Sequence, residues 1–332
     1  MNLYLDKEIE ECLIANKFIS SKNNYIVEKL SGGVSSDIWK ITNENCIYCL
    51  KKAKNKLDVK EDWYVPIERN IYEYEWYNEV NKLNSNIAPK VIYSDSKNFF
   101  FIMEYFDEKK FPLWKKELFK SNIDISFSQS VAQNLSFIHL NSFNNNELKN
   151  KFDTIKLFED LRIDPYIRFT ATIHDDIKNK LLDIANDLHN KKITLVHGDI
   201  SPKNILINNK KPIFLDAECA WYGDPAFDLA FCINHLLLKS IKLPKVKKLL
   251  YKSFITLSDT YLMKVKWEDP KLFEKRTILI LSALMLGRID GKSPVEYITS
   301  NYDKQLVRSF SKSIIQNPTN SLLEFSNKWF QD

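Results

Sequence analysis

Two short apolar runs in the middle of the chain, 205–207 and 213–215, constrain its fold more than any other feature. Runs of Ile, Leu and Phe favour β-strands, and the sequence Asn-Asn-Lys-Lys between them is typical of a turn. The pattern therefore predicts a β-hairpin. Asn204 directly precedes the first strand and Asp216 directly follows the second, so a hairpin brings these two side chains together. Asp199, five residues before Asn204, is expected beside them.

The three side chains at this end of the hairpin offer only oxygen ligands. Two carboxylates and one carboxamide suit Mg²⁺, which binds a few protein oxygens and completes its shell with water and substrate phosphates. The sequence therefore predicts that Asp199, Asn204 and Asp216 together form a magnesium site.

The same segment carries a resemblance to a known family. His197-Gly198-Asp199-x4-Asn204, followed by Leu215-Asp216-x-Glu218, resembles the catalytic core of the aminoglycoside phosphotransferase family, to which choline kinases and methylthioribose kinases are related. Protein kinases have His-Arg-Asp-x4-Asn and then Asp-Phe-Gly at these places. Glycine stands here instead of the arginine, and Ala-Glu follows the second Asp, so the resemblance is to the small-molecule branch of the protein-kinase-like fold.

This resemblance implies an α+β fold of two lobes. A small, β-rich N-lobe over residues 1–104 would carry the nucleotide-binding sheet, a flap and one long helix. A larger, mostly helical C-lobe over residues 105–332 would carry the catalytic hairpin and the acceptor-binding helices.

The resemblance also implies an ATP- and Mg²⁺-dependent phosphotransferase acting on a hydroxyl group of a small molecule. In such an enzyme, Asp199 orients the acceptor hydroxyl and accepts its proton, while Asn204 and Asp216 hold the metal ion against the phosphates. His197 and Asp228 are expected to support the catalytic loop through hydrogen bonds. Phosphoryl transfer of this kind depends on positioning and electrostatics more than on covalent chemistry by the protein.

A nucleotide-covering flap is predicted near the N-terminus. Residues 25–30 and 38–42 have the composition of strands, and the turn between them is rich in glycine and serine. Backbone N–H groups of such a turn can cover phosphates. The residues assigned to the flap are Ser31, Gly32, Gly33, Ser35 and Ser36. The sequence does not match the Gly-x4-Gly-Lys-Ser/Thr phosphate loop, which argues against a P-loop enzyme.

Lys51 ends an apolar run on the next expected strand, 47–51, where kinases place a lysine that contacts the α- and β-phosphates. Lys52 would point to the opposite face of that strand. The partner of Lys51 is sought on an expected helix over residues 66–83. By resemblance the choice is Glu73, with Glu75 as the alternative.

Residues at the expected junction of the lobes complete the nucleotide site. The strand 99–103 leads into Glu104, Tyr105 and Phe106. In the resembled family, backbone groups at this place hydrogen-bond the edge of adenine, so the identity of the side chains carries little information.

The acceptor is left open by the sequence. Five residues are candidates to line its pocket: Glu218, Trp221, Tyr222, Asp224 and Arg288. The acids favour a cationic or polyhydroxyl acceptor, and the aromatic residues could hold an amine by cation–π attraction, worth ~0.5–2 kcal/mol. The arginine instead favours an anionic or hydroxylated group. Metabolic and antibiotic-resistance roles, and ATP and GTP, are likewise not distinguished.

Composition excludes several other classes. With 332 residues, 44% of them hydrophobic and 27% charged, the chain is globular. The net charge of +5 is spread among interspersed acids and bases, which gives no nucleic-acid footprint. The sequence contains no run of about 18 apolar residues, so no membrane span is expected. The N-terminus has no signal-peptide pattern. Five scattered cysteines suggest no disulfide framework, so a cytoplasmic protein is expected. The oligomeric state is not readable.

Two alternatives to a small-molecule kinase remain. A protein kinase would carry an activation segment ending in Ala-Pro-Glu, and no such tripeptide occurs. A catalytically silent nucleotide-binding module would tend to have lost one of the catalytic residues, yet all are present.

Two helices are expected within 152–192, and His174 and His189, which have no evident partner, are expected to be solvated.

Overall fold

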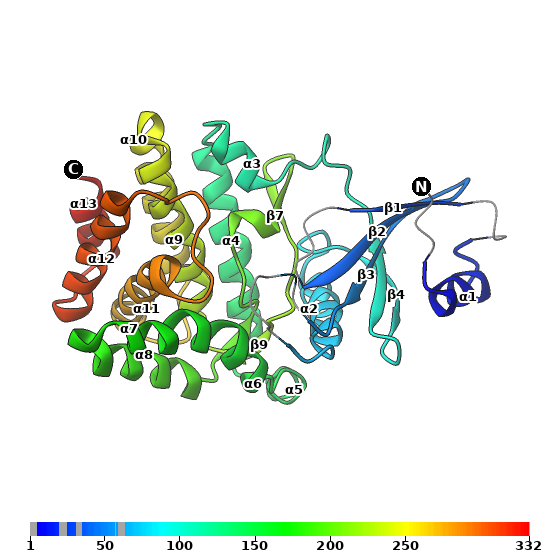
Figure 1. Ribbon diagram of the computed structural model, residues 1–332, viewed down its shortest axis with the longest axis horizontal. Coiled ribbons are helices and arrows are strands. Elements are labelled where there is room, and N and C mark those ends of the chain that lie inside the picture. The colour runs from blue at the N-terminus through cyan, green and yellow to red at the C-terminus, as the bar shows by residue number, and fades with distance from the viewer. Residues whose placement is uncertain (1–4, 20–24, 31–34, 57, 59–63, 332) are drawn as a thin grey trace. The chain divides into compact units, whose positions relative to one another are not determined.

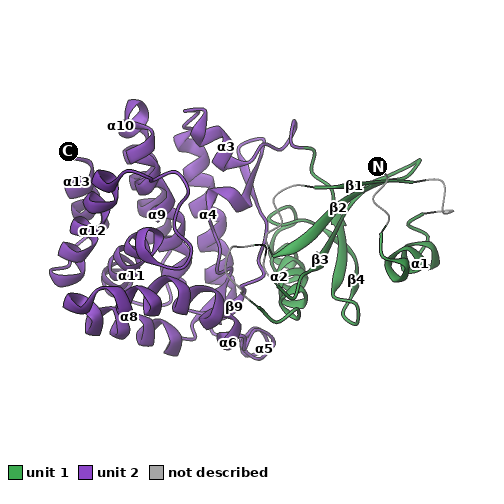
Figure 2. Ribbon diagram, in the orientation of Figure 1, with its two compact units in different colours: residues 1–107 green, residues 108–332 purple. Residues whose placement is uncertain are grey.

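The computed structural model describes residues 5–19, 25–30, 35–56, 58 and 64–331. The chain divides into two compact units, Met1–Asp107 and Glu108–Asp332 (Figure 2). The sequence-based boundary lies close to this division, after residue 104. The separate nucleotide- and acceptor-binding roles of the two parts stay a prediction.

Unit 1 is built on one antiparallel sheet of five strands in the order β1-β2-β3-β5-β4 (Figure 1). Its strands are β1 (Ile26–Lys29), β2 (Ser36–Thr42), β3 (Ile47–Ala53), β4 (Val91–Asp95) and β5 (Phe100–Glu104). Two helices accompany them, α1 (Lys7–Ala15) and α2 (Arg69–Leu83). The strands and helices predicted for this part of the chain are all present, within a few residues of the expected bounds.

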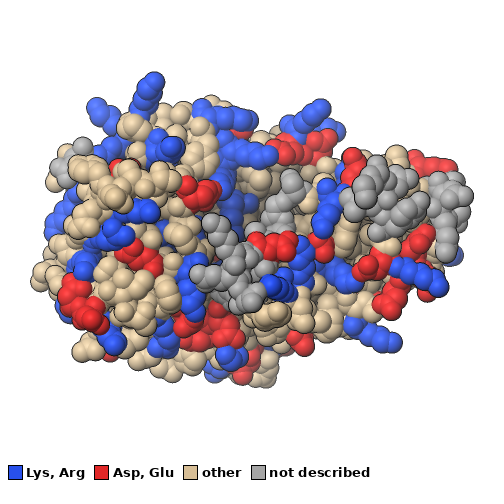
Figure 3. Space-filling model, in the orientation of Figure 1, with Lys and Arg blue, Asp and Glu red and all other residues tan. Residues whose placement is uncertain are grey.

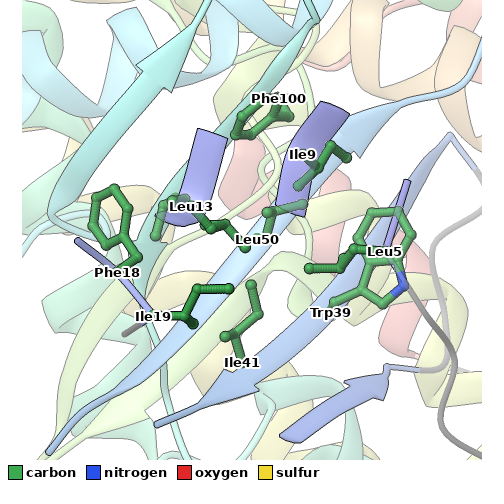
Figure 4. Packing of buried hydrophobic residues seen from close by; sticks show 10 residues of the cluster. Leu5, Ile9, Leu13, Phe18, Ile19, Trp39, Ile41, Leu50 and Phe100 are labelled. Atoms are coloured by element: carbon green, nitrogen blue, oxygen red, sulfur yellow. The ribbon is translucent and has the colours of Figure 1, made fainter. Parts of the chain in front are cut away.

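Helix α1 packs its apolar face on the sheet (Figure 4). Ile9 and Leu13, four residues apart and therefore on one side of the helix, are almost fully buried. They meet residues from three strands, among them Ile41, Leu50 and Phe100. This contact explains why the N-terminal segment folds as a helix: its stability comes from burying one apolar stripe on the sheet.

Unit 2 is mostly helical. Its α-helices are α3 (Trp114–Phe119), α4 (Ile125–Ser142), α5 (Asn146–Lys151), α6 (Ile155–Phe158), α7 (Phe169–Ile173), α8 (Lys178–Asn190), α9 (Ala226–Lys242), α10 (Lys247–Leu262), α11 (Pro270–Asp290), α12 (Asn301–Gln316) and α13 (Leu322–Phe330). Three single-turn 3₁₀ helices are η2 (Asp175–Ile177), η3 (Pro202–Asn204) and η4 (Pro244–Val246). Within the described residues, no helix combines the length and the apolar character that crossing a membrane would need.

Two strand pairs lie within residues 194–223, which contain the predicted catalytic residues and are called the catalytic segment below. Strands β7 (Ile205–Asn208) and β8 (Lys211–Phe214) form the predicted hairpin, in which Ile205 pairs with Phe214. Its two turn residues, Asn209 and Lys210, have positive φ angles of 46° and 66°, as a tight hairpin turn requires. The second pair joins β6 (Thr194–Val196) to β9 (Trp221–Gly223).

One helix differs from the sequence-based expectation. The first of the two helices expected within 152–192 begins as α6, but α6 ends at Phe158 and a π-helix, η1 (Glu159–Arg168), follows it. Pro165 lies inside this π-helix, where it lacks the N–H that an α-helical hydrogen bond needs. Helix α11 passes close by at Gly287, where an added Cβ would lie 2.2 Å from the carbonyl oxygen of Tyr166. The turns of a π-helix are wider than those of an α-helix, and here they direct Arg162 and Tyr166 toward the catalytic segment.

Candidate active site

The end of the hairpin gathers the predicted oxygen ligands. The backbone N–H of Leu215 donates to the carbonyl of Asn204 over 2.8 Å, so Asp216 follows immediately beside Asn204. The Nδ2 of Asn204 donates to the carbonyl of Asp199 over 3.1 Å, which leaves its Oδ1 as the remaining acceptor. Asp216 has a φ of 68°, a left-handed conformation that Asp tolerates better than most residues. Among the described residues, no three side chains of His, Cys, Asp or Glu form a metal site of their own.

Asp199 lies at the centre of the site and is only 2% exposed. Its Oδ2 is 2.9 Å from Nη2 of Arg162 and 3.1 Å from Nζ of Lys203. Both basic groups thus meet the same oxygen, and the second oxygen of the carboxylate is left for another partner.

Arg162, in η1, was not identified from the sequence. Its Nε donates to the carbonyl of Gly198 over 2.7 Å, while Nη2 reaches Asp199. One buried guanidinium therefore holds both a backbone and a side-chain group of the catalytic loop. Nothing in the spacing of Arg162 distinguishes it, because its position depends on the π-helix.

Lys203 was also missed, although it lies inside the motif, between Asp199 and Asn204. Its side chain is 52% exposed while its ammonium contacts the buried carboxylate. Burial of the surroundings opposes the charge of Lys203, but Asp199 and Asp216 raise the pKa of its ammonium above the ordinary value. The spacing of four residues from Asp199 in a short loop was the available signal.

His197 is buried, and its hydrogen bonds are those of a neutral imidazole ring. The backbone N–H of Asp199 donates to its Nδ1 over 3.1 Å, so its Nε2 carries the proton and donates to the carbonyl of Leu215 over 3.1 Å. Burial lowers the pKa of His197, although nearby Asp228 and Asp199 oppose this shift. The imidazole thus links the catalytic loop to the end of strand β8 without a positive charge.

Asp228, in the first turn of α9, binds the backbone that precedes Asp199. It accepts hydrogen bonds from the N–H groups of His197 and Gly198, over 2.8 and 2.9 Å. Nε2 of His139 lies 3.3 Å from the same carboxylate. Gly198 has a φ of 79°, and an added Cβ would lie 2.5 Å from the carbonyl oxygen of Cys219, so no larger residue fits. These contacts fix the loop, while its catalytic role stays a prediction.

Unit 1 contains the predicted lysine–glutamate pair. Lys51 of β3 is 3% exposed, and its Nζ lies 2.7 Å from Oε1 of Glu73 in α2. The hydroxyl of Tyr77 donates to the same oxygen over 2.7 Å. Glu73, the first choice from the sequence, is therefore a partner of Lys51. The neighbouring Lys52 points elsewhere and pairs with Asp6.

The predicted flap is only partly described. Ser31, Gly32 and Gly33 lie outside the described residues, whereas Ser35 directly precedes β2 and Ser36 begins it. Arg69 of α2 donates to the carbonyl of Ser35 and, over 2.6 Å, to that of Lys54. The base of the flap is therefore tied to α2.

The residues assigned to adenine binding follow the central part of the sheet. Glu104 ends β5, and its N–H donates to the carbonyl of Lys90 over 3.0 Å. Nζ of Lys40 lies 5.5 Å from the ring centre of Tyr105, and Phe106 follows, half-buried. Their contact with a nucleotide stays a prediction.

The structure corrects the expected acceptor wall. Trp221 is completely buried and stacks on Phe158 with ring centres 4.3 Å apart, so its face is taken by the core. Tyr222 is 3% exposed, and its hydroxyl donates to the carbonyl of Ser142 over 3.0 Å. Both residues lie in β9, whose pairing with β6 buries them. A cavity of about 230 Å³ adjoins Tyr222, but no residue of the catalytic loop lines it.

Two further candidates differ in their surroundings. Asp224 is fully buried, accepts from the N–H of Ala226 at the start of α9, and forms a two-pronged ion pair with Arg276. This capping and pairing role replaces the expected acceptor contact. Glu218 is 7% exposed, and its charge acts on Arg162. Arg288, at the end of α11, is half-buried, and its Nη1 donates to the hydroxyl of Tyr166 over 3.2 Å.

The expectation for two histidines is also corrected. His174 is buried, and its Nε2 lies 2.9 Å from Asp290, which also pairs with Arg308. His189 is partly exposed and lies 2.8 Å from Glu159. Asp290 lies 116 residues from His174 and Glu159 lies 30 residues from His189, so no local pattern indicates either pair.

The comparisons with known proteins agree with this geometry. Residues 134–239, which include the whole catalytic segment, match the model of the "Phosphotransferase enzyme family". A methylthioribose kinase from Geobacillus sp. (strain WCH70) is 24% identical over 212 residues, covering 56% of this chain and 52% of that protein. The chain thus spans about half the length of the curated relatives that it matches.

Two solved structures resemble the fold over nearly the whole chain. An amicoumacin kinase in complex with AMP-PNP and Ca²⁺ aligns with a TM-score of 0.57 and 13% identity, covering 98% of this chain and 100% of that one. An ADP-bound aminoglycoside phosphotransferase aligns with a TM-score of 0.52 and 17% identity, covering 94% and 97%. At this identity the likeness establishes the fold, which is α+β and kinase-like. Together with the sequence match over 134–239, it confirms the resemblance of the chain to the aminoglycoside phosphotransferase family.

Proposed function

We propose that the protein transfers the γ-phosphoryl group of ATP to a hydroxyl group of a small molecule, in the presence of Mg²⁺. The observation that carries the proposal is the arrangement of the catalytic loop, where Asp199 is buried, oriented by two cations, and adjacent to Asn204 and Asp216. The family match over this segment supports it. Relatives named as methylthioribose kinase and amicoumacin kinase act, by their names, on small molecules.

Asp199 is the residue that would orient the acceptor hydroxyl and accept its proton. Arg162 and Lys203 both bind Oδ2, so Oδ1 is the oxygen that would face the hydroxyl. The hydrogen bonds that Asp228 and Arg162 make with the preceding backbone keep the carboxylate in place. Correct placement of a base and an acceptor accounts for a large part of the rate enhancement in such reactions.

Asn204 and Asp216 fit a divalent cation. Asn204 uses its Nδ2 on the carbonyl of Asp199, so its Oδ1 is the group available for an ion, and Asp216 adds a carboxylate from the other end of the hairpin. Mg²⁺ typically takes a few protein oxygens as ligands and completes its coordination shell with oxygens of water and phosphate. Bound there, the ion would neutralise charge on the phosphates.

Lys51 would contact the α- and β-phosphates of the nucleotide. Its ion pair with Glu73 holds the ammonium in one orientation, and strand β3 and helix α2 fix both ends of the pair. The backbone at Glu104, Tyr105 and Phe106 would bind the adenine, and the segment from Ser31 to Ser36 would cover the phosphates.

The test is ADP release in the presence of Mg-ATP, screened over a library of hydroxyl-bearing metabolites and antibiotics. We expect at least one compound to stimulate release, and Asp199→Asn to lower that rate about 10³-fold while ATP still binds. Asp187→Asn, at an exposed aspartate of the same unit, is the matched control and should leave the rate unchanged. Turnover retained in Asp199→Asn would overturn the assignment, and absence of stimulation by every compound would favour a silent nucleotide-binding module.

A further inference from the structure

Unit 2 contains three basic side chains, two buried and one half-buried, that make no contact with Asp199. His235 and Lys239 lie four residues apart on α9, and Arg288 lies at the end of α11. We call these three residues the interior basic cluster. Residues spaced by four share one helix face, so His235 and Lys239 point to the same side of α9, as does Phe231 one turn earlier.

Lys239 is the most unusual member. It is 1% exposed, and its Nζ lies 5.4 Å from the ring centre of Phe119 and 5.1 Å from that of Tyr297. In the described part of the chain, no carboxylate lies within ion-pair distance of it. Burial, together with the positive charges of Lys115 and Arg288, lowers the pKa of Lys239 to about 7. The two aromatic faces offset only part of the cost of burying an ammonium group.

The other members also have unused hydrogen-bonding capacity. Nε of Arg288 and Nε2 of His235 are buried and have no hydrogen-bond partner among the described residues, and the same holds for the hydroxyl of Tyr297. Glu296, the carboxylate adjoining Tyr297 in the chain, is paired with Lys115 over 2.5 Å. Buried polar groups are normally hydrogen-bonded, and a single bound oxyanion would satisfy several of these groups at once.

The cluster adjoins the catalytic carboxylate through a short series of contacts. Arg162, which binds Asp199, lies over the ring of Phe231, and Tyr166 contacts the same ring. The guanidinium of Arg288 lies 5.6 Å from the ring centre of Tyr166. The path from Asp199 to the interior basic cluster thus runs through side chains in direct contact. An acceptor whose hydroxyl meets Asp199 and whose other end reaches Arg288 would lie beside this cluster.

We propose that the acceptor is a hydroxy acid, and that the interior basic cluster binds its anionic group. The inference rests on the proposed function, because it assigns the far end of the same acceptor site. An oxyanion would accept hydrogen bonds from Arg288, His235 and Tyr297 and provide a counter-charge for Lys239. Polycationic acceptors are disfavoured, since unpaired cations at the end of the site would repel them.

Binding of sulfate, used as a simple oxyanion probe, tests the cluster without any turnover. We expect sulfate to raise the thermal midpoint of the full-length protein by about 3 °C or more, relative to sodium chloride of equal ionic strength. The shift should be much smaller in Lys239→Met and Arg288→Met. Lys242→Met, at an exposed lysine one turn further along α9, should behave as the wild type and corrects for the general stabilising effect of sulfate. Equal shifts in all four proteins would overturn the proposal.

Turnover of matched acceptors tests the substrate class. Gluconate is compared with sorbitol, and glycerate with glycerol, because the members of each pair share hydroxyl groups and differ in a carboxylate. We expect the acid to give a kcat/KM about 10-fold higher or more, with the preference lost in Lys239→Met and retained in Lys242→Met. Preference for the neutral member, or for choline, would overturn the proposal. Sulfate binding without turnover of any compound would uphold the anion site and overturn the proposed function, so the two failures are distinct.

Discussion

Both units of the protein hold a buried carboxylate against basic side chains, but the two arrangements differ in their balance of charge. In unit 1, Lys51 faces Glu73, and both groups are almost fully buried. In unit 2, Asp199 is shared by Arg162 and Lys203, both at the same carboxylate oxygen, and Lys239 and Arg288 of the interior basic cluster lie in the same unit. The first is a pair of one cation and one carboxylate, whereas in the second one carboxylate oxygen meets two cations.

This difference suggests different roles in the proposed reaction. The pair between strand β3 and helix α2 fixes Lys51 in one orientation for the phosphates that it would contact. Burying a cation is costly unless an anion compensates its charge, and both partners of the proposed phosphoryl transfer to a hydroxy acid are anionic. On the face shown in Figure 3, acidic and basic side chains are interspersed.

The largest expected effect comes from breaking the pair of Lys51 and Glu73. Glu73→Ala leaves the ammonium of Lys51 buried without this partner, and we expect it to lower the free energy of unfolding by ~3–5 kcal/mol. Lys52→Ala removes only the partly exposed pair with Asp6 and should cost about 1 kcal/mol or less. Urea denaturation measures both. Equal losses in the two variants would contradict the view that burial makes the first pair important.

The elements around these pairs show what a sequence can reveal. The hairpin 205–214 followed from two apolar runs and a polar turn, because strand pairing over a tight turn is a local matter. The pairing of Lys51 with Glu73 followed from the family pattern and is present in the structure. In both cases the deciding residues lie at fixed places within regular elements.

The missed and corrected residues depend on tertiary contacts that have no local signal. Arg162 reaches Asp199 only because a π-helix replaces the expected α-helix. Trp221 was placed in an acceptor wall, but the pairing of β9 with β6 turns it into the core. Asp224 was expected to line the acceptor pocket, yet it is bound by Arg276, 52 residues further along the chain. Proximity in the sequence to Asp216 was therefore a poor guide to the acceptor site.

A smaller effect is expected when Asp199 loses one of its two cations. Arg162→Met should lower kcat about 10²-fold, because the carboxylate and the Gly198 carbonyl both lose their support, while KM for ATP stays the same. Arg162→Lys should restore part of kcat by returning the charge without the two-point contact. Steady-state kinetics with the acceptor found by the library screen measures this. A change in KM for ATP with kcat intact would show that Arg162 does not position Asp199.

The smallest effect concerns the pH dependence of the protein's stability that the buried ammonium group of Lys239 produces. Lys239 has a pKa of about 7 in the folded protein against 10.5 as its ordinary value. Between these values the unfolded chain binds more protons than the folded one, so this residue makes stability rise with pH across that window. Its destabilising effect is complete below pH 7. The groups acting on it are Lys115, Arg288, Glu296 and Cys232, and Tyr297 and Phe119 pack against it.

Lys239→Met isolates this contribution, because the other titrating groups are common to both proteins. We expect the variant to be more stable than the wild type by ~1–2 kcal/mol at pH 6, since an apolar side chain replaces an unpaired buried cation. The difference should shrink as the pH rises from 7 toward 10, where the wild-type lysine folds without its proton. Urea denaturation at pH 6, 8 and 9.5 measures it, with Lys242→Met as the control that should show no such trend. A difference that is constant with pH would mean that Lys239 is charged in the folded protein throughout, and hence that it already has a counter-charge.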